Sequence, residues 1–329
     1  MRLALNFLSF TISASLFGPL LCRGKVDHIL VYEPSPFTIG LPAVLLRTIK
    51  SAPLSFWVQD LWPESLSATG AVKSEAVLSL VSCMVKFIFH RCDRVLIQSE
   101  SFRNPVEAQG AKSDRVFYFP NSAEVLFTSP PKYDGELPVL AEGFKVLFAG
   151  NIGAAQDFET IITAAEMLKS TIAIQWVFVG DGRMRRWCET EVRKRGLERT
   201  VHFLGQFPLE AMPIFFSAAD TLLVTLRKEP IFALTVPSKI QSYLACGKPV
   251  VAALDGEGAS IIEKAGAGYT CPAGAPDALA QAVLKMYKLP YAERLIMGER
   301  GSAYYKLNFD RDMLIDRLDG LMRKLVGVS

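Results

Sequence analysis

Short runs rich in Val, Ile, Leu and Phe alternate with stretches of helical periodicity along most of this sequence. In the first part of the chain the hydrophobic runs occupy residues 28–32, 54–59, 93–99 and 115–120. They are nearly continuous, which is typical of strands that helices cover on both faces. The pattern therefore predicts a parallel sheet in an α/β domain.

A composition break at residues 128–143 divides the chain. Its sequence, TSPPKYDGELPVLAEG, combines proline, glycine and mixed charge with little apolar periodicity, which is typical of an interdomain linker. Beyond it the alternation restarts, with hydrophobic runs at 145–150, 174–182, 201–205, 221–226, 249–254 and 268–271. We expect two Rossmann-like doubly wound domains, 1–130 and 131–309, with a ligand at the carboxyl ends of the strands between them.

Composition narrows the class of protein. Half of the 329 residues are hydrophobic and the net charge is only +3, as in a globular protein of two domains. No strongly basic tract is present, so nucleic acid is not an expected partner. The six cysteines are scattered without a CxxC pair, which indicates reduced thiols in a cytoplasmic protein and no metal site.

The run from Leu3 to Leu21 carries no charge and is just long enough to span a bilayer. Three interpretations stay open: a helix of the folded domain, a signal peptide and a membrane span. Polar residues interrupt the run, and Gly18 and Pro19 break it near its end. Together with the cysteine usage, this favours a helix of the folded domain.

Two glycine-containing turns follow predicted strands. In GNIGAAQD, Gly150 and Gly153 allow the backbone to approach a phosphate, and the helix that follows presents free N–H groups. In VGDG, residues 179–182, Asp181 either contacts a nucleoside or caps a helix. Neither turn is a GxGxxG motif, so close packing is the alternative reason for their glycines.

The stretch TVPSKIQSYLACGKPVV, residues 235–251, predicts a short helix between two loops. Thr235 or Ser238 is expected to cap it, Pro237 suits its first turn, and Gly247 ends it. Lys239 is unusual there, because a cation in the first turn opposes the helix dipole by about 0.3–1 kcal/mol. A bound diphosphate would reverse that sign, whereas a solvated lysine is the alternative.

Charged residues follow two further strands. Gly256, Glu257 and Gly258 are expected to form a tight loop in which the carboxylate accepts ribose or sugar hydroxyls. Arg227 and Lys228 are placed to neutralise phosphate, although adjacent exposed charges are more often a solvated loop.

Several motifs together carry a family resemblance that covers nearly the whole chain. They are QDLWPES (59–65), DRVLIQSESFR (93–103), FPNSAE (119–124), LFAGNIGAAQDFETIITAAE (147–166), VFVGDG (177–182) and VPSKIQSYLACGKPVVAALDGEG (236–258). With them the sequence resembles glycosyltransferase family 4, retaining nucleotide-sugar-dependent enzymes of the GT-B fold. The likeness is strongest to the branch that builds bacterial O-antigens and exopolysaccharides.

The resemblance implies that the second domain binds the donor, that the first binds the acceptor, and that a last helix, 310–329, crosses back to the first. The expected nucleotide-sugar contacts are Gly150, Asn151, Gly153, Gly180, Asp181, Gly182, Arg227, Pro237, Ser238, Lys239, Ser242, Gly256 and Glu257. The expected catalytic residues are Lys239, Asp60 and Glu257, with no metal and no cofactor. Asp60, helped by Glu64, orients the acceptor hydroxyl or, alternatively, caps a loop.

The sequence departs from the family pattern at several positions. The Arg and Lys that grip the diphosphate in relatives match the neutral Asn151 and Gln156. The usual pair of glutamates falls on Leu234 and Ser242, and a histidine near the sugar matches Gln59. The first strand-and-helix units of relatives have no counterpart, which points to a late start site or a truncated gene. We therefore expect Lys239, with Arg227 or Lys228, to neutralise the diphosphate. We expect Glu257 to take the role of the missing glutamates.

The expected reaction moves a sugar from a uridine or guanosine diphosphate to a lipid-linked saccharide, at the cytoplasmic face of the inner membrane, with the configuration kept. An N-acetylated deoxyhexosamine and fucose are candidate sugars. A front-face attack fits, because no carboxylate is placed as a nucleophile. Two alternatives stay open: a sugar-nucleotide 2-epimerase of the same architecture, and a non-catalytic remnant that binds nucleotide or membrane.

Overall fold

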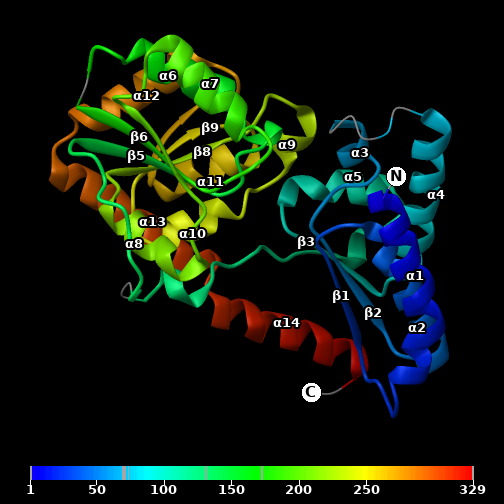
Figure 1. Cartoon of the computed structure of the whole chain (residues 1–329). Helices are drawn as coiled ribbons and strands as arrows, with labels where there is room; N and C mark the ends of the chain where they lie inside the picture. The colour runs from blue at the N-terminus through cyan, green and yellow to red at the C-terminus, as the bar shows by residue number, and fades with distance from the viewer. Residues whose placement is uncertain (1, 69–71, 73, 130–131, 172, 328–329) are drawn as a thin grey trace. The chain divides into compact units, whose positions relative to one another are not determined.

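The computed structural model describes residues 2–68, 72, 74–129, 132–171 and 173–327. The chain forms two compact units, Met1–Pro120 with Asp312–Ser329, and Asn121–Arg311. Each unit is an α/β domain built on a parallel sheet (Figure 1), as the sequence predicts.

The division between the units lies ten residues before the predicted one. The predicted boundary, between residues 130 and 131, is outside the described residues, and the structure divides the chain after Pro120. The reason is that Tyr133, Leu137 and Leu140 of the expected linker pack against the core of the second unit. The composition break therefore marks a surface segment of the second unit.

The first unit holds a four-stranded sheet in the order β1-β2-β3-β4. Its strands are β1 (Ile29–Glu33), β2 (Leu54–Val58), β3 (Arg94–Ile97) and β4 (Val116–Tyr118), all parallel. Its helices are α1 (Arg2–Leu21), α2 (Gly40–Lys50), α3 (Glu64–Ala68), α4 (Glu75–Phe89), α5 (Arg103–Ala108) and α14 (Arg311–Val326). On α14, Leu314 is buried against Leu96 and Phe119, so the carboxyl-terminal helix is part of this unit.

The apolar run near the amino end forms α1, which lies beside α2 (Figure 1). Within the described parts of the chain, no helix combines the length and the hydrophobicity needed to cross a bilayer. Thr11 is buried on α1, while many of its large apolar side chains are exposed to solvent. These exposed side chains are Leu5, Leu8, Phe10, Ile12, Leu16, Phe17, Leu20 and Leu21.

The second unit holds a six-stranded parallel sheet in the order β10-β9-β8-β5-β6-β7. Its strands are β5 (Phe144–Ala149), β6 (Ile174–Val179), β7 (Val201–Gly205), β8 (Thr221–Thr225), β9 (Val250–Ala253) and β10 (Gly268–Cys271). Its helices are α6 (Phe158–Met167), α7 (Arg185–Arg195), α8 (Met212–Ala218), α9 (Pro230–Leu234), α10 (Lys239–Ala245), α11 (Glu257–Ala265), α12 (Pro276–Lys288) and α13 (Tyr291–Asn308).

Both faces of this sheet are buried. Along β5, Leu147 packs into one hydrophobic cluster while Val146 and Phe148 pack into the other, as the two-residue period of a strand requires. Helices α6, α7 and α12 cover one face, and α8, α10 and α13 cover the other (Figure 1). This double coverage explains why the strands appear as continuous hydrophobic runs in the sequence.

Three helices were not predicted: α3, α9 and α13. The longest, α13, has no apolar stripe, because it buries Gly298, Gly301 and Tyr305 instead of a row of large side chains. A Cβ atom at Gly298 would lie 2.0 Å from the carbonyl oxygen of Gly247, so the helix approaches its neighbour by backbone contact. Packing of this kind leaves no hydrophobic periodicity to detect.

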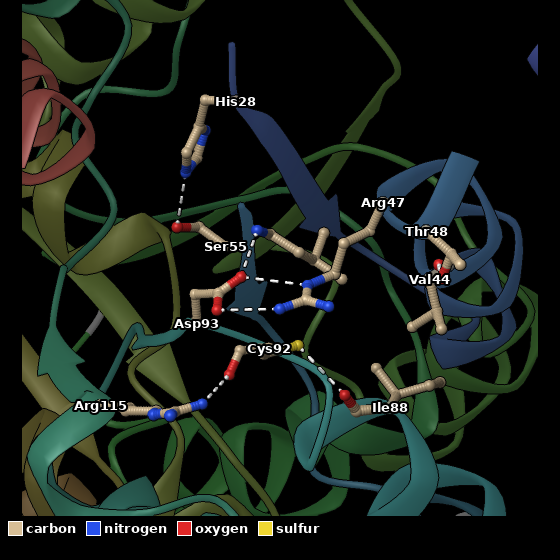
Figure 2. A network of polar contacts seen from close by, with 10 residues as sticks. His28, Val44, Arg47, Thr48, Ser55, Ile88, Cys92, Asp93 and Arg115 are labelled. Atoms are coloured by element: carbon tan, nitrogen blue, oxygen red, sulfur yellow. Dashed lines mark hydrogen bonds and ion pairs between the residues drawn. The ribbon is translucent and has the colours of Figure 1, made fainter. Parts of the chain in front are cut away.

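A polar network ties α2 to the starts of β2 and β3 (Figure 2). The Arg47 guanidinium donates to both carboxylate oxygens of Asp93, at 3.0 and 3.1 Å, and the amide of Leu54 donates to the same carboxylate at 2.9 Å. Beside them, a ring nitrogen of His28 lies 3.0 Å from the Ser55 hydroxyl. Burial acts to raise the pKa of Asp93, but the bonds from Arg47 and Leu54 outweigh it, and the pKa is lowered.

Replacing Asp93 by Asn should lower the free energy of unfolding of the first unit by about 1.5–3 kcal/mol, the range for a hydrogen bond to a charged group. Because the folded-state pKa lies below the ordinary 3.8, this contribution is present above that value and is lost as the pH falls through the folded-state pKa. Urea unfolding at pH 7 and pH 3 measures both effects.

Asp319→Asn is the matched control, because Asp319 pairs with Arg323 on exposed α14, at 2.6 Å. An exposed pair of this kind contributes about 0.5 kcal/mol or less. Equal losses in the two variants would contradict the structural role given to Asp93.

Candidate functional site

A cavity of about 860 Å³ opens in the second unit at the carboxyl ends of β5, β6 and β7. It is lined by Ser122, Glu124, Phe127, Ala149, Gly150, Asn151, Val179, Gly180, Asp181, Gln206, Phe207, Pro208, Leu209, Met212, Phe216, Ser238, Lys239, Ser242 and Tyr243. In open parallel sheets ligands bind at this edge of the strands. The cavity is therefore the candidate binding site of this unit.

The two predicted glycine turns contact each other at the floor of the cavity. Gly150 has φ +132° and Gly180 has φ +138°, a region in which side chains are strained. The amide of Gly150 donates to the carbonyl of Val179 at 2.8 Å. A Cβ atom at Gly180 would lie 2.0 Å from the carbonyl oxygen of Gly150, so only glycine fits there. The floor therefore consists of backbone atoms that a ligand can approach closely.

Helix α10 starts at Lys239, and its start differs from the prediction. Ser238 is the residue before the first turn, but its side chain makes no capping hydrogen bond. Thr235 follows α9 instead, and its hydroxyl donates to the carbonyl of Ile231. Pro237 precedes the helix, and its carbonyl accepts from the amide of Ile240. The predicted cap at Thr235 was wrong because this residue ends α9, and Ser238 occupies the cap position of α10 without a side-chain hydrogen bond.

Tyr243 of α10 holds the end of β5 in place. Its side chain is almost fully buried, and its hydroxyl oxygen accepts a hydrogen bond from the amide of Ala149 at 3.2 Å. Its ring meets that of Phe216 edge-on, with centroids 5.2 Å apart. Because Ala149 directly precedes Gly150, this bond positions the first glycine turn relative to α10.

Lys239 is the one cationic side chain among the described residues that line the cavity. Its Nζ lies 3.8 Å from the centre of the Phe148 ring, and its side chain runs against Gly150. Within the described parts of the chain, no carboxylate oxygen lies within 4.0 Å of this nitrogen.

Burial lowers the pKa of Lys239 to about 7. The ammonium thus faces the cavity with a ring face as its partner, and it has no counter-ion among the described residues. A small anion bound beside Lys239, over the glycine turns, would supply the missing charge.

The structure gathers part of the predicted donor site around this lysine. The predicted residues that line the cavity are Gly150, Asn151, Gly180, Asp181, Ser238, Lys239 and Ser242. Gly182 is not among the residues that line the cavity, and a Cβ atom there would be 2.3 Å from the carbonyl oxygen of Ile152.

Other predicted residues lie elsewhere in the second unit. Gly153 and Arg227 line a neighbouring pocket of about 340 Å³, where Arg227 is exposed and 4.0 Å from Glu229. Lys228 is exposed in the same loop, which fits the solvated alternative.

The DGEG segment was wrongly predicted as a loop. Gly256 precedes α11 with φ +73°, and Glu257 is the first residue of the helix, with Gly258 inside it. A Cβ atom at Gly256 would lie 1.9 Å from the carbonyl oxygen of Ala233, which is the physical reason for this glycine. Pro237, Gly256 and Glu257 are not among the residues that line the cavity.

The far wall of the cavity was missed by the sequence reasoning. It follows β7 and consists of Gln206, Phe207, Pro208, Leu209 and Met212, with Phe216 and Phe127 beside them. The sequence offered one signal, because the predicted strand VHFLG ends directly before Gln206. In the structure the carbonyl of Gly205, the last residue of that strand, accepts a hydrogen bond from the amide of Gly180 at 2.7 Å. Three strands end side by side at this edge, so the segment after the third one also faces the ligand.

In the first unit, Asp60 follows β2 and is half-buried, and burial raises its pKa. It lines a small pocket together with Glu64 and with the buried Glu33, the last residue of β1. Sequence reasoning passed over Glu33 because a strand-terminal glutamate carries no motif of its own.

The model of the family "Glycosyl transferases group 1" matches residues 132–303, which is more than half of the chain. The sequence is 26% identical over 339 residues to the probable glycosyltransferase WbjE of Pseudomonas aeruginosa, covering all of this chain and 82% of that one. It is 28% identical over 251 residues to the putative colanic acid biosynthesis glycosyl transferase WcaI of Escherichia coli K12, covering 73% of this chain and 60% of that one.

Among solved structures, the fold is similar to that of Anabaena Alr3699/HepE in complex with UDP, with a TM-score of 0.75 at 15% identity. The match covers 96% of this chain and 82% of that one. The same Anabaena protein has also been solved with UDP-glucose. At this level of identity the likeness shows the fold.

Proposed function

The chain belongs to the group 1 glycosyltransferases, and we propose that it moves a sugar, with retained anomeric configuration, from a nucleoside diphosphate to a saccharide acceptor. Membership confirms the resemblance to glycosyltransferase family 4 and, with the structural neighbours, the GT-B fold. The observation that carries the proposal is Lys239, a cavity-lining ammonium with no counter-ion among the described residues, beside two glycine turns.

The donor diphosphate is proposed to lie beside Lys239, against the main chain of the turns that follow β5 and β6. The mainly apolar far wall, from Phe207 to Met212, suits the flat ring system of a nucleobase. HepE binds UDP and UDP-glucose in its solved complexes, which supports a uridine nucleotide, and guanosine remains the second candidate. An N-acetylated deoxyhexosamine and fucose remain the candidate sugars.

In the proposed reaction the bond between the anomeric carbon and the diphosphate oxygen breaks while the acceptor oxygen bonds to the same face. The departing phosphate oxygen takes the acceptor proton, so no further base is required. Lys239 stabilises the charge that develops on the leaving group, and the scheme assigns this role to no metal. Asp60 orients the acceptor hydroxyl, and Glu257 has no assigned step because it does not line the cavity.

The name of WcaI, a putative colanic acid biosynthesis glycosyl transferase, supports a place in the synthesis of a cell-surface polysaccharide such as an O-antigen or exopolysaccharide. A lipid-linked diphosphate saccharide is the acceptor class that we propose. The exposed apolar side chains of α1 support peripheral contact with lipid at the cytoplasmic face of the inner membrane.

Lys239→Ala should reduce transfer by about 10²–10³-fold, the usual loss when one preorganised donor to a developing oxyanion is removed. Transfer is measured with a panel of UDP- and GDP-sugars and an Escherichia coli lipid extract as acceptor. Lys285→Ala is the matched control, because Lys285 also lies over an aromatic ring, 4.0 Å from the centre of Tyr269, but outside the cavity. Equal loss in both variants, or an epimerised sugar nucleotide formed without acceptor, would refute the proposal.

Binding of UDP-glucose should weaken as the pH rises through about 7, by about tenfold per pH unit. The sign follows from Lys239: the cation prevails below its pKa, and an anionic ligand binds that form, so binding near pH 8 takes up a proton. Calorimetry in two buffers of different ionisation enthalpy detects this uptake. Lys239→Ala should abolish it, and uptake that persists in this variant would place the titrating group elsewhere.

Replacing Leu16 and Phe17 together by Glu should weaken binding to phosphatidylethanolamine–phosphatidylglycerol vesicles at least about tenfold, because each buried apolar side chain contributes about 1.5–3 kcal/mol. Both side chains are more than half exposed on α1. Val139→Glu is the control, since Val139 is 98% exposed in the segment before β5. Co-sedimentation measures binding, and unchanged binding of the double variant would exclude α1 as the contact.

A further inference from the structure

Glu33 is a buried carboxyl group that the scheme above does not use. It ends β1, its side chain is fully buried, and it pairs in register with Val58 at the end of β2. One carboxyl oxygen accepts hydrogen bonds from the amides of Gln59 at 3.2 Å and Asp60 at 3.4 Å. The other accepts from the indole nitrogen of Trp62 at 3.1 Å. A single side chain thus holds three points of the segment that carries Asp60.

We propose that Glu33 is a positioning residue of the acceptor side, whose carboxyl group fixes the segment 59–62 so that Asp60 presents its carboxylate to an acceptor hydroxyl. The inference rests on the proposed function, since it assumes that Asp60 meets the acceptor. It explains why a carboxyl group is kept at a fully buried position, where it is costly. It also explains why three donors of one loop converge on it.

The charge balance around Glu33 supports this role. Burial raises its pKa to about 8, the charge of Asp60 adds to the rise, and the hydrogen bonds from Gln59, Asp60 and Trp62 act in the opposite direction. At neutral pH Glu33 is therefore mostly uncharged, and Asp60 keeps the negative charge of the pair. Glu64 is the other titratable group that lines this pocket.

Apart from Glu64 of α3, the helical segments beside the pocket contribute neutral side chains. These are Val85, Ile88 and Phe89 of α4, Pro105 and Val106 of α5, and Gln109 after it. Ionisation of Glu33 above pH 8 therefore places a second negative charge beside Asp60, and no cation is among the described residues that line this pocket. The acceptor side should lose its arrangement in that range, separately from the loss of donor affinity as Lys239 deprotonates near pH 7.

Tryptophan fluorescence of the full chain between pH 6 and pH 10 reads the contact through Trp62. We expect a transition with a midpoint near pH 8 that disappears in Glu33→Gln and in Trp62→Phe. Asp60→Asn should move the midpoint to lower pH, because it removes the neighbouring charge, whereas Glu64→Gln should leave it unchanged. A transition that survives Glu33→Gln, or that ignores Asp60→Asn, overturns the inference.

Kinetics then test the positioning role, with UDP-glucose as donor and farnesyl-diphosphate-linked N-acetylglucosamine as acceptor. Glu33→Ala should lower kcat/KM for the acceptor by about 10²-fold, the cost of a misplaced reacting group, while the Kd for UDP stays unchanged. At a saturating donor concentration, Glu33→Gln should restore most of the activity and remove its decline above pH 8. If Glu33→Ala keeps full kcat/KM, the inference fails. A chain that binds neither UDP nor GDP refutes the proposed function instead, and the fluorescence result still decides the role of Glu33.

Discussion

The contact between the turns at Gly150 and Gly180 is the constraint on which the candidate site depends. A Cβ atom at Gly180 would lie 2.0 Å from the carbonyl oxygen of Gly150, and one at Gly150 would lie 2.7 Å from the Lys239 side chain. Both positions adopt φ values that favour glycine, and Lys239 can lie across Gly150 because no side chain is there. The parallel sheet makes the contact possible, since β5 and β6 end beside each other at the same edge.

The electrostatics of the site depend on how few cationic side chains line the cavity. The loop that follows β5 carries the neutral Asn151 and Gln156 and no cationic residue. The described lining of the cavity contains a single cation, which rests on the ring of Phe148. Burial lowers the pKa of this cation, so ligand charge and lysine protonation are linked in this protein.

The sequence predicted the architecture well because burial on both faces leaves a strong pattern. Phe148 and its neighbours on β5 form one unbroken apolar run, and the parallel sheets follow from such runs. Helix α13 escaped prediction because it packs through Gly298 and Gly301, which leave no periodicity. The unit boundary was misplaced because Leu137 and Leu140 pack into the second core from a segment with the composition of a linker.

The site was predictable only where local chemistry marks it. The glycine turns and Lys239 stand out as residue types in unusual places, and they lie together in the structure. The wall from Gln206 to Met212 depends on the order of the strands, which no local pattern encodes. Glu33 depends on strand register, since Val58 opposite it decides which amides it reaches.

On one side of the cavity the turns after β5 and β6 place main-chain atoms of Gly150 and Gly180 beside the ligand, and the phenol of Tyr243 holds the end of β5, whereas the segment after β7 lines the other side with side chains. Backbone conformation restricts substitution at the two glycines, and it does not restrict substitution in this way after β7. Variants of this scaffold that accept a different nucleotide or a bulkier sugar should therefore carry changes among residues 206–212 and keep both glycines.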